Sequence, residues 1–526
     1  MVTTGTVAQI LAGLATLEPD TTVLTYYRAG QRESTWTAGR LLAAVHTARR
    51  RLSVGAGERV VIQSGNRPEF IVTALAVMAS GAIAVPIAPD ESIARAGYIV
   101  HHSRASLLVY DPATVTPADH GVPGRSMDTI CDGTGPTPGH AELRAWDARL
   151  SPAQPATLLY TSGTTGRPKG VTLSHGNLTA NAEALKRVHD LREGAAHICV
   201  LPLYHANAYG FSMITTLYAK GHLVLNDAFP LFGIREIVNS ERAEIISVIP
   251  QIIRLWSQRP LKADEVPSLR YLVSAAAPLS VELARAFHSV TRLRIHQGYG
   301  LSECTNFATT VPHDISPDDY ERVMHGERVP SIGAELYGMT CATVDGAGNE
   351  LPEGVEGEIV VRGGSVMSGY WDDPEASAAA LRGGVLHTGD LGFWRLVGDR
   401  RYFFVTGRIK ELIIRAGGNL SPRELEDELD LPHDLAVVGF PHDAVGEEVG
   451  LYVRGPLSTA EQDHLLARLH GVPFARRPKV VVCGREPVPR TSTGKVRRAA
   501  VTQWFAAYHD VVLTTTVLVD EGKEGD

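Results

Sequence analysis

The chain of 526 residues contains only five cysteines, and they follow no pattern. Cys131, Cys199, Cys304, Cys341 and Cys483 are scattered, odd in number and without the spacing of a metal site. Reduced thiols, and with them a cytoplasmic enzyme, are therefore expected. The net charge of −8 provides no overall field that attracts nucleic acid or acidic membranes, so neither is expected as a partner.

A leader sequence and a membrane span are also not expected. Residues 1–14 have no basic region before their apolar residues, so they do not resemble a signal peptide. Residues 70–89 carry no charge over twenty residues, a length that spans a bilayer. Gly81 and two prolines interrupt this segment, which favours a buried helix over 69–80 followed by a buried strand over 82–87.

The residues that are present have the composition of an ordinary globular protein, with 44% apolar and 21% charged residues. Strand-like apolar runs at 59–62, 82–87 and 107–110 alternate with a helical pattern over 68–80, for which Asn66 is a candidate N-cap. This alternation predicts an α/β fold with mostly parallel sheets flanked by helices. At this length, several folding units are expected.

One loop stands out, with the sequence Tyr-Thr-Ser-Gly-Thr-Thr-Gly-Arg-Pro-Lys-Gly at 160–170. A predicted strand over 156–160 leads into it. Its glycines let the backbone curl and expose N–H groups, four hydroxyls add donors, and Lys169 adds positive charge. It is not a Walker A loop, because no Gly-Lys-Ser/Thr follows the required spacer. Taken alone, it fits either a polyphosphate-binding loop or a flexible polar surface loop.

These eleven residues resemble the phosphate loop of the adenylate-forming superfamily, which contains acyl-CoA synthetases, aryl-acid ligases, luciferases and peptide-synthetase adenylation domains. The resemblance extends through ordered motifs from about residue 155 to 498, whereas residues 1–154 agree only in general pattern. It implies a large N-terminal domain over 1–409 and a small, mobile α+β domain over 410–526. It also implies ATP-binding roles for Thr161, Ser162, Gly163, Thr164, Thr165, Gly166 and Lys169.

Two further segments resemble motifs that bind the nucleotide. The small residues Ser-Ala-Ala-Ala-Pro-Leu at 274–279 either pack tightly or let a flat ring lie close to the backbone. The family's adenine-bordering segment favours the second interpretation, through Ala276 and Ala277, although the family usually has a glycine where Ala275 or Ala276 stands here. The segment 297–303 resembles the family's Gly-Tyr-Gly-x-Ser/Thr-Glu element. The resemblance implies that the nucleotide is contacted by Tyr299, Gly300 and Ser302. It also implies that Glu303 is a ligand of Mg²⁺.

The ribose and the domain hinge are assigned from the next two motifs. His-Thr-Gly-Asp at 387–390 is either an ordinary turn or a ribose site, because one carboxylate can accept hydrogen bonds from both ribose hydroxyls. Its place in the series of motifs favours ribose for Asp390. The resemblance also implies that Arg408 holds the ribose and that Lys410 is the hinge residue.

The acid is expected beyond a strand that ends at Pro202. His205 follows that strand end, where ligands gather in α/β sheets, although a histidine in a loop is the plain alternative. The resemblance places His205 near the carboxylate and implies that Asn207, Ala275 and Gly298 line the acid pocket. Residues 203–212 contain no carboxylate to bind an α-ammonium group, so an apolar or aromatic acid is expected rather than an amino acid.

The C-terminal motifs complete the expected reaction. Lys495 lies in a basic loop, either an anion site or a solvated face, and the resemblance makes it the lysine of the adenylation step. Gly417 and Gly418 match the turn that faces the incoming thiol. The expected cofactors are ATP, Mg²⁺ and coenzyme A. A discrete carrier protein as thiol acceptor, and a nucleotide-binding module without turnover, are the alternatives.

Overall fold

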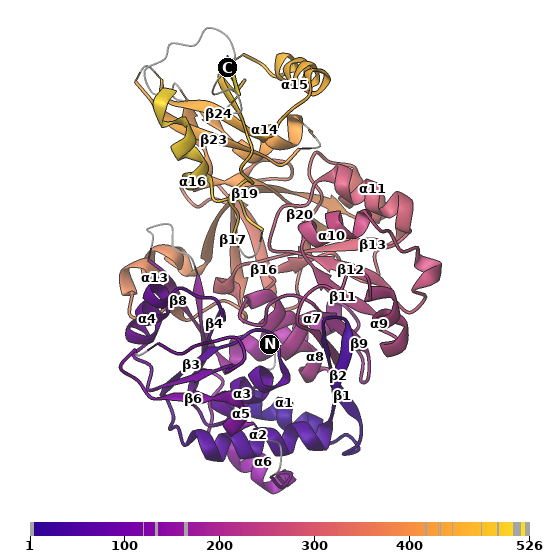
Figure 1. Cartoon of the computed structure of the whole chain (residues 1–526), viewed down its shortest axis with the longest axis vertical. Helices are drawn as coiled ribbons and strands as arrows, with labels where there is room; N and C mark the ends of the chain where they lie inside the picture. The colour runs from indigo at the N-terminus through magenta and orange to yellow at the C-terminus, as the bar shows by residue number, and fades with distance from the viewer. Residues whose placement is uncertain are drawn as a thin grey trace.

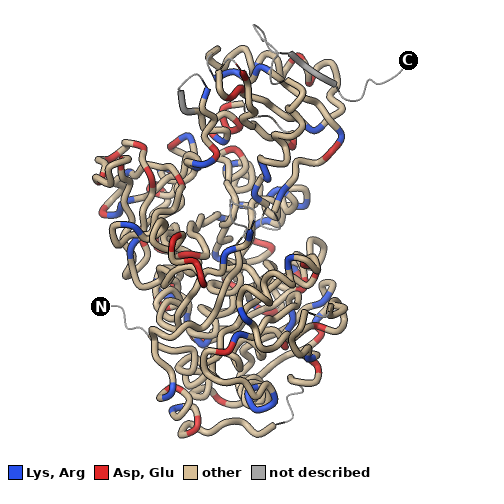
Figure 2. Tube along the Cα trace, turned by 90° about the vertical axis from the view of Figure 1, so that its left-hand side faces the viewer, with Lys and Arg blue, Asp and Glu red and all other residues tan. Residues whose placement is uncertain are grey.

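The computed structural model describes residues 5–118, 120–131, 135–161, 167–415, 418–429, 431, 433–443, 445–474, 476–491, 494–508 and 517–520. The elements form a large part that contains the N-terminus and a smaller part formed by the C-terminal residues (Figure 1). Lys, Arg, Asp and Glu are interspersed over both parts, in keeping with the small net charge (Figure 2).

The largest sheet has thirteen strands and two different halves. One half is parallel apart from its edge strand β2 (Gln31–Thr37), and contains β1 (Thr22–Arg28), β10 (His222–Asn226), β9 (Ala196–Cys199), β11 (Ile245–Val248), β12 (Tyr271–Ser274) and β13 (Arg294–Tyr299). The other half is antiparallel, and contains β14 (Thr309–Thr310), β15 (Gly333–Glu335), β20 (Arg400–Arg408), β19 (Leu386–Val397), β17 (Gly357–Gly363) and β16 (Met339–Val344). The sequence pattern indicated the parallel half but gave no sign of the antiparallel one.

The second sheet has seven strands in the order β18-β8-β7-β4-β3-β5-β6. Its bounds are β18 (Gly369–Tyr370), β8 (Lys169–Ser174), β7 (Pro155–Thr161), β4 (Ile83–Ile87), β3 (Arg59–Gln63), β5 (Leu107–Tyr110) and β6 (Gly124–Ser126). The three apolar runs expected in the first part of the chain are the parallel strands β3, β4 and β5.

Helices buried in one large hydrophobic core pack with these two sheets. They include α1 (Val7–Leu14), α2 (Ala38–Leu52), α3 (Pro68–Ala79), α7 (His175–Val188) and the π-helix η1 (Asn207–Thr215). Ten of the twelve residues of α3 are apolar, which suits a helix covered on all sides. The uncharged segment is thus α3 followed by β4, and no described helix is long and apolar enough to cross a membrane.

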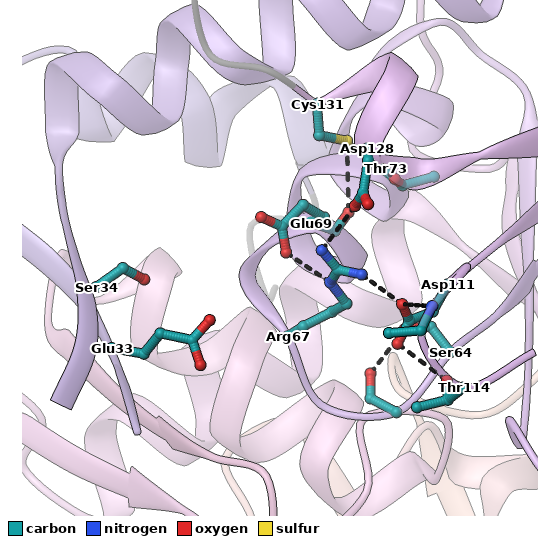
Figure 3. Close-up of polar contacts among 12 residues, drawn as sticks. Glu33, Ser34, Ser64, Arg67, Glu69, Thr73, Asp111, Thr114, Asp128 and Cys131 are labelled. Atoms are coloured by element: carbon teal, nitrogen blue, oxygen red, sulfur yellow. Dashed lines mark hydrogen bonds and ion pairs between the residues drawn. The ribbon is translucent and has the colours of Figure 1, made fainter. Parts of the chain in front are cut away.

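The start of α3 differs from the expected cap. Asn66 does not cap the helix, because Arg67 occupies the N-cap position. The Asn66 amide instead bonds the backbone of Leu201, Leu203 and Asn226, tying this loop to the large sheet. Arg67 lies among the carboxylates drawn in Figure 3, and pairs with Glu69, Asp111 and Asp128.

The C-terminal residues form a third, six-stranded sheet with its own two hydrophobic clusters. It contains β21 (Ile413–Arg415), β22 (Gly418–Leu420), β23 (Leu435–His442), β24 (Gly446–Arg454), β25 (Val480–Gly484) and β26 (Val517–Asp520). Its helices are α14 (Pro422–Leu429), α15 (Thr459–Gly471) and α16 (Arg498–Thr502). The chain passes from the large sheet to the third sheet between the end of β20 at Arg408 and the start of β21 at Ile413.

Candidate active site

A cavity of about 730 Å³ lies where the two parts of the molecule meet. It lies past the carboxyl ends of β11, β12 and β13, where ligands gather in parallel sheets. Eight of the residues singled out in the sequence line it: Ala276, Ala277, Gly298, Tyr299, Gly300, Asp390, Arg408 and Lys495. Segments separated by more than two hundred residues in the sequence therefore share one site.

Asp390 is the centre of a cluster at the nucleotide end of the cavity. It lies on β19 directly opposite Arg408 on β20, and only 3% of it is exposed. Its Oδ1 pairs with Arg408 Nε at 2.8 Å, and its Oδ2 accepts a hydrogen bond from the Tyr299 hydroxyl at 2.7 Å. Each carboxylate oxygen keeps a second lone pair, so the diol of a ribose can bind to a group already held in place.

The turn at Gly389, directly before Asp390, has a specific backbone conformation and fixed contacts. Gly389 has a φ of +71°, a left-handed conformation that favours glycine. Its N–H donates to Glu358 Oε1 at 3.0 Å, and His387 Nδ1 lies 2.8 Å from Glu358 Oε2. The backbone just before Asp390 is therefore held by Glu358, and Asp390 itself is paired with Arg408 on the neighbouring strand. Burial, followed by the Asp390 charge, raises the pKa of Tyr299, which keeps its hydroxyl protonated as a donor.

Glu303 projects from the short 3₁₀ helix η3 (Ser302–Cys304). Its Oε1 accepts a hydrogen bond from the Tyr370 hydroxyl at 2.8 Å, and Lys169 Nζ lies 5.0 Å from the centre of the Tyr370 ring. Burial and then the Glu303 charge raise the pKa of Tyr370, so it remains a donor. Tyr370 thus links the Mg²⁺ carboxylate expected from the sequence to the end of the phosphate loop.

The protein groups around Glu303 fit a Mg²⁺ that is shared with a nucleotide. Among the described residues there is no group of three or more His, Cys, Asp or Glu side chains that would enclose a metal. Mg²⁺ is usually held by one or two carboxylates together with substrate phosphates and water. Glu303 supplies one such carboxylate, with one oxygen oriented by Tyr370 and the other available.

Lys495 comes from the third-sheet part of the chain and reaches the cavity from the opposite side. Its backbone is held by Thr491: the Lys495 N–H donates to Thr491 Oγ1 at 3.1 Å, and the Thr491 N–H donates to the Lys495 carbonyl at 2.8 Å. Burial, then the positive charge of Arg408, lowers the pKa of its ammonium group, while Asp390 and Glu303 act in the opposite direction. An anion beside Lys495 would relieve this repulsion, so the position suits a phosphate or carboxylate.

His205 and Asn207, the residues expected near the acid, are not among those that line this cavity. Burial, with a smaller contribution from Lys495, lowers the pKa of His205 to about 4, so its ring is neutral at pH 7. Asn207 begins the nine-residue π-helix η1, a rare form that is often found at functional sites. Asn207 Oδ1 accepts from Ser247 Oγ at 3.1 Å, whereas its Nδ2 is buried and has no partner among the described residues.

The remaining predicted residues are placed as follows. Ala275 is buried in the core and does not line the cavity, while a Cβ on Gly298 would lie 2.6–2.8 Å from the ring of Phe307. Ser302 begins η3, and Lys410 is exposed within the 3₁₀ turn Ile409–Glu411. Thr161 pairs with Lys169 across β7 and β8, which closes the phosphate loop at its base. Residues 162–166 and Gly417 lie outside the described residues. The backbone of Gly418 is described, but its surface exposure is not.

Two contacting residues were not singled out from the sequence. Tyr370 belongs to the sequence Gly-Tyr-Trp at 369–371, and Gln251 follows Pro250 just after the end of β11. The rule that ligands lie past the carboxyl ends of parallel strands would have pointed to Gln251. The hydrogen bond from Tyr370 to Glu303 joins residues 67 positions apart, and nothing in the sequence pattern marks it.

Comparison with known proteins agrees with this geometry. The family model described as AMP-binding enzyme matches residues 14–371. Feruloyl-CoA synthase from Amycolatopsis sp is 31% identical over 497 residues, covering 92% of this chain and 94% of that protein. The crystal structure of ATP-bound MatB from Rhodopseudomonas palustris superposes with a TM-score of 0.80 at 27% identity, covering 95% of this chain and 99% of that one. Apo MatB superposes with a TM-score of 0.71 at 26% identity and the same coverage.

The fold and the site define an adenylate-forming enzyme, and the chain belongs to the AMP-binding enzyme family. Within that family it is an AMP-forming acyl-CoA synthetase. Such an enzyme uses ATP to activate a carboxylic acid and then transfers the acyl group to coenzyme A.

Proposed function

We propose that the substrate is an apolar or aromatic carboxylic acid without an α-amino group, and that the cavity at the meeting of the two parts is where it is activated. The observation that carries the proposal is the convergence of Lys495, Asp390 and Tyr299 on one cavity from separate parts of the chain. Within this cavity, Ala276 and Ala277 would border adenine, Asp390 with Arg408 would hold the ribose, and Gly300 would face the phosphates. Ser302, two residues beyond Gly300, would also contact the phosphates.

In the first half-reaction a carboxylate oxygen attacks the α-phosphorus of ATP, and pyrophosphate leaves. Negative charge grows on the α-phosphate and the departing oxygens, so fixed positive charge is what accelerates the step. Lys495 would supply that charge to the carboxylate and the α-phosphate. Mg²⁺ held by Glu303 would neutralise phosphate charge when bound. The neutral His205 would position the acid through a hydrogen bond.

In the second half-reaction the sulfur of coenzyme A attacks the acyl carbonyl, the carbon–sulfur bond forms and AMP leaves. Lys495 occupies the cavity in the present arrangement. We therefore propose that the small domain, 410–526, turns at Lys410 against the large domain, 1–409, and brings the turn at Gly417 and Gly418 to the thiol. The better superposition with ATP-bound than with apo MatB supports the view that the present arrangement serves adenylation.

The acid class is inferred from the segment around His205. Residues 203–212 contain no carboxylate, and Tyr209 and Phe211 within η1 are fully buried. The similarity to a feruloyl-CoA synthase supports an aromatic or apolar acid. All five cysteines are buried and none forms a disulfide, which supports a reducing, cytoplasmic location.

A panel of carboxylic acids tests this proposal. Acid-dependent release of pyrophosphate from ATP should be strongest for apolar and aromatic acids and weak for α-amino acids. Thioester formation should then proceed with coenzyme A alone. A requirement for a separate carrier protein in place of coenzyme A would support the alternative acceptor, and a preference for amino acids would contradict the assigned acid class.

A further inference from the structure

The Gln251 side chain connects the loop that carries Lys495 to the large part of the molecule. Gln251 is the second residue of α10 (Pro250–Ser257), the helix that follows β11. Its Nε2 donates to the carbonyl of Gly494 at 3.0 Å. Gly494 directly precedes Lys495, and both residues line the cavity together with Gln251. This contact therefore joins the two parts of the molecule within one residue of the lysine.

Two independent observations show why a glycine is required at position 494. Its φ is +84°, a conformation that side chains other than glycine rarely adopt. A Cβ on this residue would also lie 2.2–2.5 Å from the three terminal side-chain atoms of Gln251. The glutamine amide thus packs flat against the glycine backbone as well as bonding its carbonyl.

On its other side the loop is fixed to its own sheet. The carbonyl of Gly494 also accepts from Arg490 Nη1 at 3.1 Å. Arg490 pairs through Nη2 with Asp434 Oδ1 at 2.8 Å, and Asp434 Oδ2 accepts from the N–H of Val488 at 3.0 Å. Because these bonds join residues of the same part, they would move with the loop. The bond from Gln251 would break whenever that part turned away.

We propose that Gln251 is a positioning residue for adenylation: it docks Gly494 so that Lys495 is held beside Asp390 and Glu303 during the first half-reaction. This inference rests on the proposed role of Lys495. Gln251 does not touch the reacting atoms, and acts through the loop. Because the contact belongs to one orientation of the small domain, its loss should slow adenylation and leave thioester formation unchanged.

The test measures each half-reaction separately in the full-length enzyme. Adenylation is followed by single-turnover pyrophosphate release with an accepted acid, and thioester formation by adding coenzyme A to presynthesised acyl-adenylate. Gln251→Ala should slow adenylation about tenfold, the worth of one hydrogen bond in a docked loop, and change thioester formation less than twofold. Gln258→Ala, an exposed glutamine just after the same helix, is the matched control and should change neither rate.

A second variant keeps the inference testable if Gln251→Ala also relaxes the helix. Gly494→Ala should slow adenylation more than Gln251→Ala does, because the new Cβ meets the Gln251 amide and the backbone is strained. In the Gly494→Ala background, adding Gln251→Ala should cause no further loss, since the contact is already broken. A full tenfold loss in that background would show that the two residues act independently and would overturn the proposal.

Failure of this inference is distinguishable from failure of the proposed function. If Lys495→Ala abolishes adenylation while Gln251→Ala leaves it unchanged, the lysine has its assigned role and Gln251 does not position it. If Gln251→Ala slows both half-reactions alike, the residue has a general structural role, and the inference is also overturned. If Lys495→Ala leaves adenylation intact, the proposed function of the site itself is contradicted.

Discussion

The residues proposed to hold the nucleotide and those proposed to meet the acid are held in different ways. Asp390, Tyr299 and Arg408 line the cavity and bond one another directly. Asn207 has a buried amide nitrogen without a partner among the described residues, and His205 is held neutral by burial. A site whose residues hold one another in place suits a ligand that is the same in every reaction, such as ATP. The buried amide nitrogen of Asn207 offers one hydrogen-bond donor with which an acid could be selected.

The largest effect is expected for Lys495, for which we propose a role in the first half-reaction only. Lys495→Ala should lower the rate of pyrophosphate release about 10²–10³-fold, the usual cost of removing one preorganised charge from a transition state. The rate of thioester formation from presynthesised acyl-adenylate should remain within about threefold of wild type. Equal losses in both half-reactions would contradict the assignment.

Asp390 tests whether the nucleotide end is a unit. Asp390→Ala removes the acceptor for the ribose and also frees Arg408 and Tyr299, whose bonds to it are charge-assisted. Two hydrogen bonds from the ribose hydroxyls to a carboxylate are worth about 3 kcal/mol, so the affinity for ATP should fall about 10²-fold. Titration calorimetry with ATP measures this loss. Asp390→Asn, which preserves shape and some hydrogen bonding, should lose less, and an unchanged affinity in Asp390→Ala would refute the ribose role.

A substitution at Lys410 tests whether the small domain turns at this residue between the two half-reactions. Proline locks φ near −65° and would prevent the large backbone rotation that a hinge residue undergoes. Lys410→Pro should keep adenylation near the wild-type rate and slow thioester formation by about tenfold or more. Lys410→Ala, which leaves φ free, is the control and should support both half-reactions. If a folded Lys410→Pro enzyme showed both half-reactions slowed alike, the hinge would lie elsewhere.

Buried histidines predict a loss of stability in acid. Burial lowers the pKa of His197 and of His296 to about 3, while the unfolded chain takes up these protons near pH 6.5. The unfolded state therefore binds more protons as the pH falls from 6.5 towards 3, and stability present above pH 6.5 is lost. At pH 5 each such histidine should cost about 2 kcal/mol.

Urea unfolding at pH 7 and pH 5 checks this expectation. The variant His197→Gln removes one titrating group and should show a shallower dependence of the unfolding free energy on pH. An unfolding free energy that is the same at the two pH values would mean that these rings are not held neutral by burial.

The residues that meet at Asp390 were predictable because they fall within short motifs, such as 297–303 and 387–390, whose glycines set the backbone shape. The parallel strands β3, β4 and β5 were predictable from their apolar runs. The antiparallel half of the large sheet was not, since its pairs, such as β15 with β20, join distant segments without a shared pattern.

The contacts that join separate segments were hidden for the same reason. Asn66 looked like a helix cap, because asparagine before a helical pattern usually is one, yet its amide links two sheets instead. Tyr370 and Gln251 acquire their importance only through Glu303 and Gly494, which lie 67 and 243 residues away along the chain. Residue type and spacing carry no information about such pairs.

The separate roles proposed for Asp390 and Asn207 are tested most directly by measuring the KM for ATP and the acid profile in Asn207→Trp beside Asp390→Ala. Asn207→Trp replaces the buried amide with a larger ring. It should change the ranking of a panel of acids in pyrophosphate release while the KM for ATP stays within about twofold of wild type. Asp390→Ala should raise the KM for ATP and leave the ranking of acids unchanged. The account would be contradicted if Asn207→Trp left the ranking of acids unaltered, or if both variants shifted both quantities together.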